Sequence, residues 1–146
     1  DIQRTLIHGY YACVSYMDAQ LGRALEALET NGFADNTLIV LWGDHGWHLG
    51  DHGMWCKHTN YEQATRIPLI IAGPPGGAVA TGKTTAALAE SVDIYPTLCE
   101  LAGLPLPTDL DGDSLTTVLE RPDSAGDEVA YHLFPRGNRL GRAIRT

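Results

Sequence analysis

The chain has 146 residues, a formal net charge of −8 and 44% hydrophobic residues, which suits one folded domain or part of a larger one. No apolar run approaches the roughly 20 residues of a membrane span. The ten lysines and arginines are scattered along the sequence, so we expect no nucleic-acid partner, and an anionic ligand would need a local cation to hold it.

The first half of the chain predicts a long helix followed by two strands. Between Thr5 and Thr30, apolar residues recur at steps of three and four, which is the period of an amphipathic helix, and Gly32 is placed to end that helix. The runs Thr37–Trp42 and Ile67–Ala72 are short, apolar and rich in strand formers, as in parallel strands buried on both faces.

The second half predicts two helices and a strand. Asp93 can cap a helix over Ile94–Ala102, a shorter helix is expected over Ser114–Leu119, and Glu128–Leu133 has the composition of a strand. Helices alternating with buried strands indicate an α/β protein, with a mostly parallel sheet flanked by helices.

The stretch WGDHGWHLGDHGMWCKH, residues 42–58, holds four of the six histidines and two copies of Asp-His-Gly. Asp44 and His45 directly follow the first predicted strand, and α/β proteins bind ligands at the carboxyl ends of their strands. Gly43 and Gly46 allow a sharp turn there. A carboxylate and an imidazole that converge suit a divalent cation such as Ca²⁺, Mg²⁺, Mn²⁺ or Zn²⁺, with further ligands from elsewhere.

Other interpretations of this stretch stay open. His45, His48 and His52 have the spacing of a zinc triad on a helix, although the intervening glycines disfavour that helix, and each histidine can instead be a hydrogen-bonded loop residue. Lys57 can supply a positive charge to a phosphate or sulfate oxygen, or be an ordinary surface lysine.

Three ordered blocks resemble the sulfatase family. GDHGWHLGDHGMWCKHTNYEQATRIPLII, residues 43–71, is similar to the C-terminal conserved block of sulfatases, with the strongest likeness to the iduronate sulfatase group and its bacterial relatives. SVDIYPTLCELAGLPLP, residues 91–107, and DGDSL, residues 111–115, are similar to the two blocks that follow. The helix at the start of the chain also resembles the helix before the metal strand in these enzymes.

This resemblance implies an alkaline-phosphatase-like α/β fold, although an incomplete one, and hydrolysis of sulfate esters, with a sulfated sugar such as a glycosaminoglycan unit as substrate. Asp44 and His45 would be ligands of Ca²⁺ or of another divalent metal. Lys57 would contact the sulfate as a catalytic residue, and Trp47 and His52 would lie near the substrate. Members of the family are mostly periplasmic, secreted or lysosomal.

The family's nucleophile is a formylglycine made from the cysteine of a C-x-P-S-R motif, and none of Cys13, Cys56 and Cys99 lies in such a motif. We therefore expect residues 1–146 to form part of a sulfatase catalytic domain that lacks the N-terminal nucleophile region and is inactive alone. Two alternatives are a phosphomonoester or phosphonate hydrolase of the same superfamily and a non-catalytic metal-binding scaffold domain.

Overall fold

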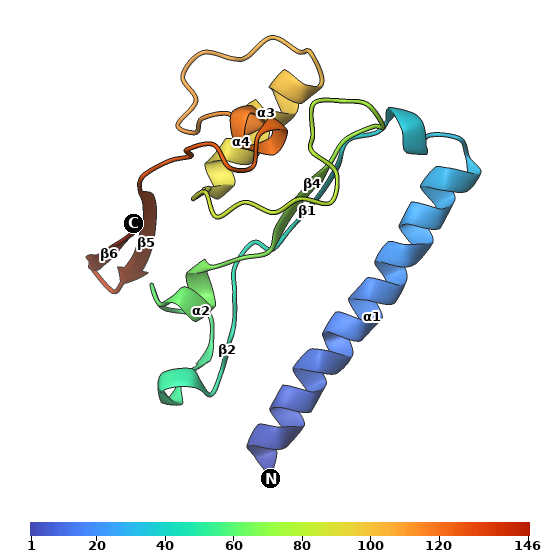
Figure 1. Ribbon diagram of the computed structural model, residues 1–146. Helices are drawn as coiled ribbons and strands as arrows, with labels where there is room; N and C mark the ends of the chain where they lie inside the picture. The colour runs from blue at the N-terminus through green and yellow to red at the C-terminus, as the bar shows by residue number, and fades with distance from the viewer.

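A long helix, α1, lies beside a set of short strands (Figure 1). The computed structural model describes all residues, 1–146. The helices are α1 (Ile2–Thr30), α2 (Glu62–Thr65), α3 (Ile94–Leu101) and α4 (Thr116–Glu120). The strands are β1 (Ile39–Trp42), β2 (His48–Leu49), β3 (Trp55–Cys56), β4 (Leu69–Ala72), β5 (Ala130–Arg136) and β6 (Arg139–Arg145). The small helices α3 and α4 lie together beyond one end of β1 and β4, and α2 lies near β2.

Helix α1 ends where the sequence predicts. Gly32 has a φ of +75°, which costs glycine little because it has no side chain. Its amide donates to the Glu29 carbonyl oxygen and the Phe33 amide donates to that of Leu28, both at 3.0 Å. These two bonds form a Schellman motif, which satisfies the last carbonyl groups of the helix and turns the chain toward β1.

The strands pair in three separate antiparallel ribbons, β1 with β4, β2 with β3, and β5 with β6. The prediction of parallel strands is therefore wrong for the pairs within this chain, although both apolar runs are strands. An apolar run indicates burial but carries no information on the direction of its partner. Between β1 and β4 the chain makes the β2–β3 hairpin and one turn of helix, and returns without the crossover that a parallel pair needs.

The best-packed part of the chain lies between α3 and α4, where Ile94, Cys99, Leu115 and Val118 are buried. Asp93 is buried at the start of α3, but its carboxylate does not cap that helix as predicted. It accepts hydrogen bonds from the amides of Glu90 at 2.6 Å and Asp113 at 3.0 Å. Those bonds hold two loops against α3, and the predicted helices here are confirmed within two residues at each end.

Most of the apolar surface faces outward. Only 10 of 146 residues are buried and the accessible surface is 10797 Å², whereas a compact monomer of 15.8 kDa exposes about 7,300 Å². No residue of α1 is buried, and its apolar stripe is covered at few points. None of the helices, α1 included, has the length and apolar character needed to cross a membrane.

Candidate active site

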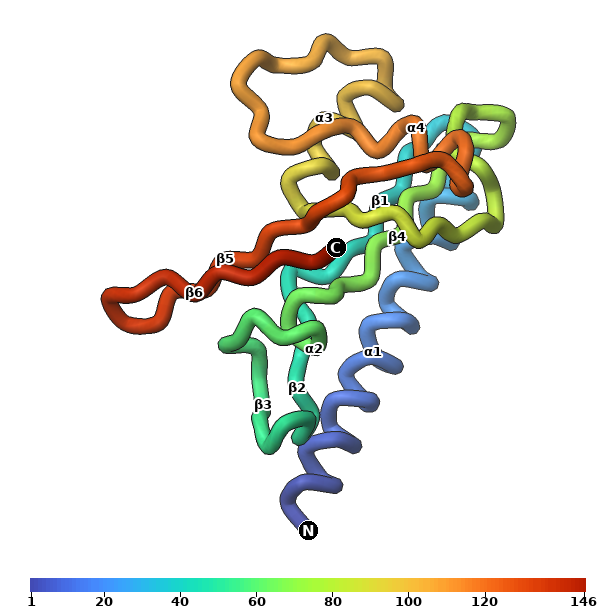
Figure 2. Tube along the Cα trace, turned by 60° about the vertical axis from the view of Figure 1, so that its left-hand side comes forward, coloured from blue at the N-terminus to red at the C-terminus, as the bar shows by residue number.

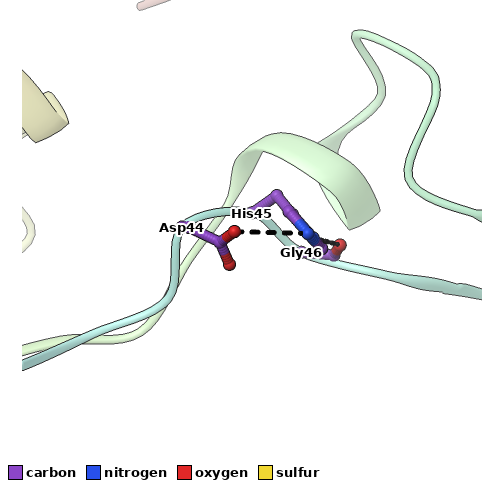
Figure 3. Close-up of polar contacts among 3 residues, drawn as sticks. All are labelled: Asp44, His45 and Gly46. Atoms are coloured by element: carbon purple, nitrogen blue, oxygen red, sulfur yellow. Dashed lines mark hydrogen bonds and ion pairs between the residues drawn. The ribbon is translucent and has the colours of Figure 1, made fainter.

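The loop after β1 brings two chemically different side chains together. Asp44 and His45 lie at the end of β1 as predicted, separated from it by Gly43, and the Asp44 Oδ2 atom lies 3.5 Å from His45 Nε2. The Asp44 side chain is 82% exposed and that of His45 is 28% exposed, so the pair opens to solvent on one side. Figure 3 shows the carboxylate and the imidazole turned toward each other across the bend of the loop.

The other ring nitrogen of His45 decides what the pair can bind. Nδ1 lies 2.9 Å from the Gly46 carbonyl oxygen, and because a carbonyl can only accept, Nδ1 carries the proton. In the neutral imidazole, Nε2 therefore presents a lone pair to the Asp44 carboxylate. Two acceptors at this separation repel each other unless a proton or a cation lies between them.

The geometry fits a shared cation. Two ligand atoms about 2.4 Å from one ion and at right angles lie about 3.4 Å apart, close to the 3.5 Å between Asp44 Oδ2 and His45 Nε2. Metal-binding histidines are commonly oriented by a hydrogen bond from their other ring nitrogen to a carbonyl or carboxylate. The Gly46 carbonyl provides such an acceptor for His45 Nδ1. No group of three or more histidine, cysteine or acidic side chains in the chain could hold a metal, so the pair provides only part of a coordination sphere.

Gly46 holds this loop by close packing against α2. Its amide donates to the Ala64 carbonyl oxygen at 2.8 Å, and a Cβ atom at this position would overlap the backbone of Gln63. Gly43 likewise leaves only a narrow space beside Pro68. Neither glycine has a positive φ. The prediction that the loop needs glycine at positions 43 and 46 is therefore supported, but these glycines permit close backbone packing rather than a sharp turn.

Trp47 lies between the Asp44–His45 pair and α1. Its ring stacks on His45 with centroids 5.9 Å apart and on Tyr10 of α1 with centroids 6.4 Å apart. The residue is 37% exposed, so part of the ring is free next to the imidazole. Stacking of this kind also ties α1 to the loop, a contact that periodicity in the sequence could not predict.

The three histidines of the proposed zinc triad do not converge. His48 on β2 is fully buried, and its Nε2 atom lies 2.8 Å from the Thr59 hydroxyl. His52 is exposed, has a φ of +55°, and packs its ring 5.0 Å from that of Tyr61. The zinc-triad interpretation is therefore wrong, because neighbouring residues in this stretch face different surroundings.

The second Asp-His-Gly copy forms a turn. The Asp51 carboxylate accepts a hydrogen bond from the Leu49 amide at 3.1 Å, and this bond, with one from its own amide, lowers the pKa of Asp51 below its usual value of 3.8. The flanking Gly50 and Gly53 both have positive φ. The carboxylate is therefore committed to the turn, whereas that of Asp44 makes no backbone bond.

Lys57 follows β3 and is half-buried. Its carbonyl accepts a hydrogen bond from the Thr59 amide at 2.8 Å, and its ammonium forms no ion pair with a carboxylate. The preceding Cys56 has a φ of +69°, which is uncommon for a residue with a side chain. This bend turns the chain out of β3 just before the lysine.

Comparison with known proteins identifies the family. The sulfatase family model matches residues 2–104. The chain belongs to the sulfatase family. A sulfatase of Formosa agariphila is 40% identical over 135 residues, covering 92% of this chain and 26% of that protein. The iduronate 2-sulfatase of Mus musculus is 35% identical over 178 residues, covering 93% of this chain and 32% of that protein.

Solved structures agree with the family and with the α/β class. A protein in complex with its substrate D-glucosamine-2-N,6-O-disulfate superposes with a TM-score of 0.82 and 36% identity, covering 91% of this sulfatase chain and 28% of the other. The resemblance in the sequence is thus confirmed. This chain spans about a quarter to a third of the length of the relatives it matches.

Proposed function

We propose that these residues form part of the active site of a sulfatase that hydrolyses sulfate esters of sugars. The observation that carries the proposal is the Asp44–His45 pair at the end of β1, with Nδ1 of the imidazole committed to the Gly46 carbonyl oxygen and Nε2 left for a cation. The sulfatases similar to this chain, and the sulfated sugar bound by one of them, support the substrate class.

Asp44 and His45 would hold a divalent metal, with Ca²⁺ as our choice. A carboxylate oxygen is a preferred ligand of Ca²⁺, whereas a histidine is a less usual one. When bound, such an ion polarises the oxygens of a sulfate ester as a Lewis acid. Gly46 and α2 fix the loop, so the two donors keep their separation while the substrate enters.

Lys57 would contact the sulfate and neutralise charge that develops near the leaving oxygen. The ester is already an anion when a nucleophile approaches, so fixed positive charge stabilises the transition state more than the ground state. The lysine ammonium meets no carboxylate in the chain and is held at the end of β3 by the Lys57–Thr59 backbone bond.

Trp47 and His52 would lie near the sugar. The exposed part of the Trp47 indole adjoins the imidazole of His45, where the apolar face of a sugar ring can pack. His52 is exposed on the β2–β3 turn, where its ring packs against that of Tyr61, and an imidazole N–H can donate to a hydroxyl or sulfate oxygen.

We further propose that the nucleophile, a formylglycine, belongs to a part of the enzyme other than these 146 residues. None of the three cysteines lies in a C-x-P-S-R motif, and residues 1–146 as a separate chain should show no turnover. Two metal ligands and one lysine can bind the substrate and stabilise developing charge, but they provide no nucleophile to attack sulfur.

The two Asp-His-Gly copies provide a matched test in the full-length enzyme. Asp44→Ala should lower kcat/KM for D-glucosamine 6-sulfate by at least about 100-fold, since a metal supplies several kcal/mol of charge stabilisation. It should also lower the metal content of the purified enzyme, measured by inductively coupled plasma emission spectroscopy. Asp51→Ala removes the same group from the turn and should leave metal content unchanged. Equal effects of the two substitutions would refute the metal assignment.

A second comparison addresses the phosphate alternative, which the sulfatase relatives do not favour. The same enzyme should hydrolyse an aryl sulfate faster than the corresponding aryl phosphate and methylphosphonate monoester. A preference for either phosphorus ester would assign the chain to the other reaction, and turnover of none of them with metal bound would favour the scaffold function.

A further inference from the structure

A cavity of about 610 Å³ lies between the segment around β3 and the β5–β6 hairpin. Its walls include Trp55 and His58, which lie on either side of the lysine in sequence, and Tyr61, Phe134 and Arg136. In Figure 2 the hairpin extends past β3 and α2. One wall of the cavity is therefore formed by sequence neighbours of Lys57, and the other by the hairpin.

Direct contacts hold the two walls of this cavity together. The rings of His58 and Phe134 have centroids 5.8 Å apart. A Cβ atom at Gly141 of β6 would lie 3.2 Å from the Asn60 side-chain nitrogen, so glycine there allows the hairpin to approach the loop. The hairpin is thus positioned by the same loop that carries Lys57.

Two arginines face each other at the end of the hairpin. Arg136 and Arg139 are paired in the β5–β6 register, so their side chains lie on the same face, and cross-strand Cβ atoms are about 5 Å apart in such pairs. Like charges in that arrangement are unfavourable. Neither guanidinium forms an ion pair with a carboxylate, so nothing in the chain compensates the repulsion.

The charge around the hairpin is unlike that of the rest of the chain. Four of the ten lysines and arginines are Arg136, Arg139, Arg142 and Arg145, and no acidic residue follows Glu128, in a chain with a net charge of −8. The view that basic residues are scattered is therefore wrong for this hairpin. A local positive field against an acidic background favours an anionic ligand here.

We propose that Arg136 and Arg139 form a subsite for a second anionic group of the substrate, a sulfate or a carboxylate on the same sugar or its neighbour. This inference rests on the proposed function, because it takes Lys57 to hold the scissile sulfate. Planar guanidinium groups bind sulfate or carboxylate oxygens in pairs. The rings of Trp55, Tyr61 and Phe134 line the same cavity as Arg136 and provide apolar walls for a sugar ring.

The hairpin contains its own control. Arg142 pairs with Leu133 and lies three residues after Arg139 on β6. Because side chains alternate between the two faces of a strand, Arg142 projects from the face opposite to Arg139. Arg136→Ala and Arg139→Ala each remove one charge from the proposed subsite, whereas Arg142→Ala removes one from the other face. Arg136→Lys keeps the charge and loses the paired donors, and it reports on the subsite if the alanine variant folds poorly.

The test measures binding and turnover in the full-length enzyme. For a heparin-type disaccharide that carries two sulfates and a uronate, we expect Arg136→Ala and Arg139→Ala to raise KM about tenfold, as for loss of a charged hydrogen bond, with kcat unchanged. D-Glucosamine 6-sulfate, which has one anionic group, should show no change in any variant, and Arg142→Ala should behave as wild type.

Calorimetric titration of the same disaccharide into the Lys57→Ala variant, with and without Arg136→Ala, separates this inference from the proposed function. About tenfold weaker binding in the double variant supports the subsite even if the enzyme hydrolyses no sulfate ester. Equal losses in the Arg136 and Arg142 variants, or equal losses for both sugars, would overturn the proposal.

Discussion

His48 and Thr59 are joined by a buried hydrogen bond of 2.8 Å between Nε2 and the hydroxyl oxygen. His48 lies on β2 and has no exposed surface, and Thr59 lies two residues after Lys57. The Thr59 hydroxyl also accepts a bond from the Tyr61 amide at 3.2 Å. One contact therefore connects β2, which follows the Asp44–His45 loop, to the loop that carries Lys57.

Removing this contact should destabilise the enzyme. Thr59→Val keeps the shape of the side chain but leaves His48 Nε2 without a partner, and an unsatisfied buried group costs about 1–3 kcal/mol. The free energy of unfolding from urea denaturation measures the loss. Thr5→Val, on the exposed surface of α1, is the control and should change it by less than about 0.5 kcal/mol. A change of less than about 0.5 kcal/mol in the free energy of unfolding of Thr59→Val would mean that the His48–Thr59 bond does not stabilise the fold.

Gly46 and Gly22 should respond in opposite directions to the same substitution. Gly46→Ala puts a methyl group against the Gln63 backbone and should cost about 1–3 kcal/mol, as overpacking does, with loss of metal because the His45 loop moves. Gly22 lies in α1 with open space around it, so Gly22→Ala should stabilise by about 0.5–1 kcal/mol. Thermal unfolding of the two variants compares the signs, and stabilisation by Gly46→Ala would contradict the close packing of the loop on α2.

The chain has two lysines, and only one should matter for catalysis. Lys57→Ala should lower kcat for a sulfated sugar by about 100-fold or more, as for loss of one group that stabilises developing charge. Lys83 is exposed in the loop before α3, and Lys83→Ala should leave kcat and KM unchanged. Initial rates of the two purified variants on the same substrate make the comparison, and near-normal turnover by the Lys57 variant would remove that residue from the mechanism.

Glu100 should make the contact between α3 and α4 sensitive to acid. The hydroxyl groups of Ser114 and Thr116 lower the pKa of Glu100 below its usual value of 4.5, and Thr116 Oγ1 donates to Glu100 Oε2 at 2.9 Å. Since the folded state favours the ionised carboxylate, this contribution is present above pH 4.5 and is lost as the pH falls through the lowered pKa.

The Glu100→Gln variant tests this dependence. Its urea midpoint should lie below that of the wild type near pH 7 and approach it near pH 3, as linkage requires. Glu128→Gln, at an exposed position without a side-chain hydrogen bond, should follow the wild type throughout. A constant difference between Glu100→Gln and the wild type over this range would show that ionisation of Glu100 does not stabilise the fold.

Local patterns in the sequence determined most of the elements and the place of the candidate site. The period of three and four residues and Gly32 define α1 and its end, because helix formation depends on neighbours within one turn. The apolar run over β1 places Asp44 and His45 at a strand end, and the ordered blocks around Lys57 indicate the sulfatase family. Each of these conclusions rests on residues that are close together in the chain.

Only the tertiary structure distinguishes residues that look alike in the sequence. Asp44 and Asp51 have the same neighbours in sequence, yet one carboxylate meets an imidazole and the other closes a turn. The antiparallel return of β4, the burial of His48 and the cross-strand pairing of Arg136 with Arg139 also depend on partners distant in sequence. Burial and register arise from packing between separate segments, and a pattern within one segment carries no record of its partner.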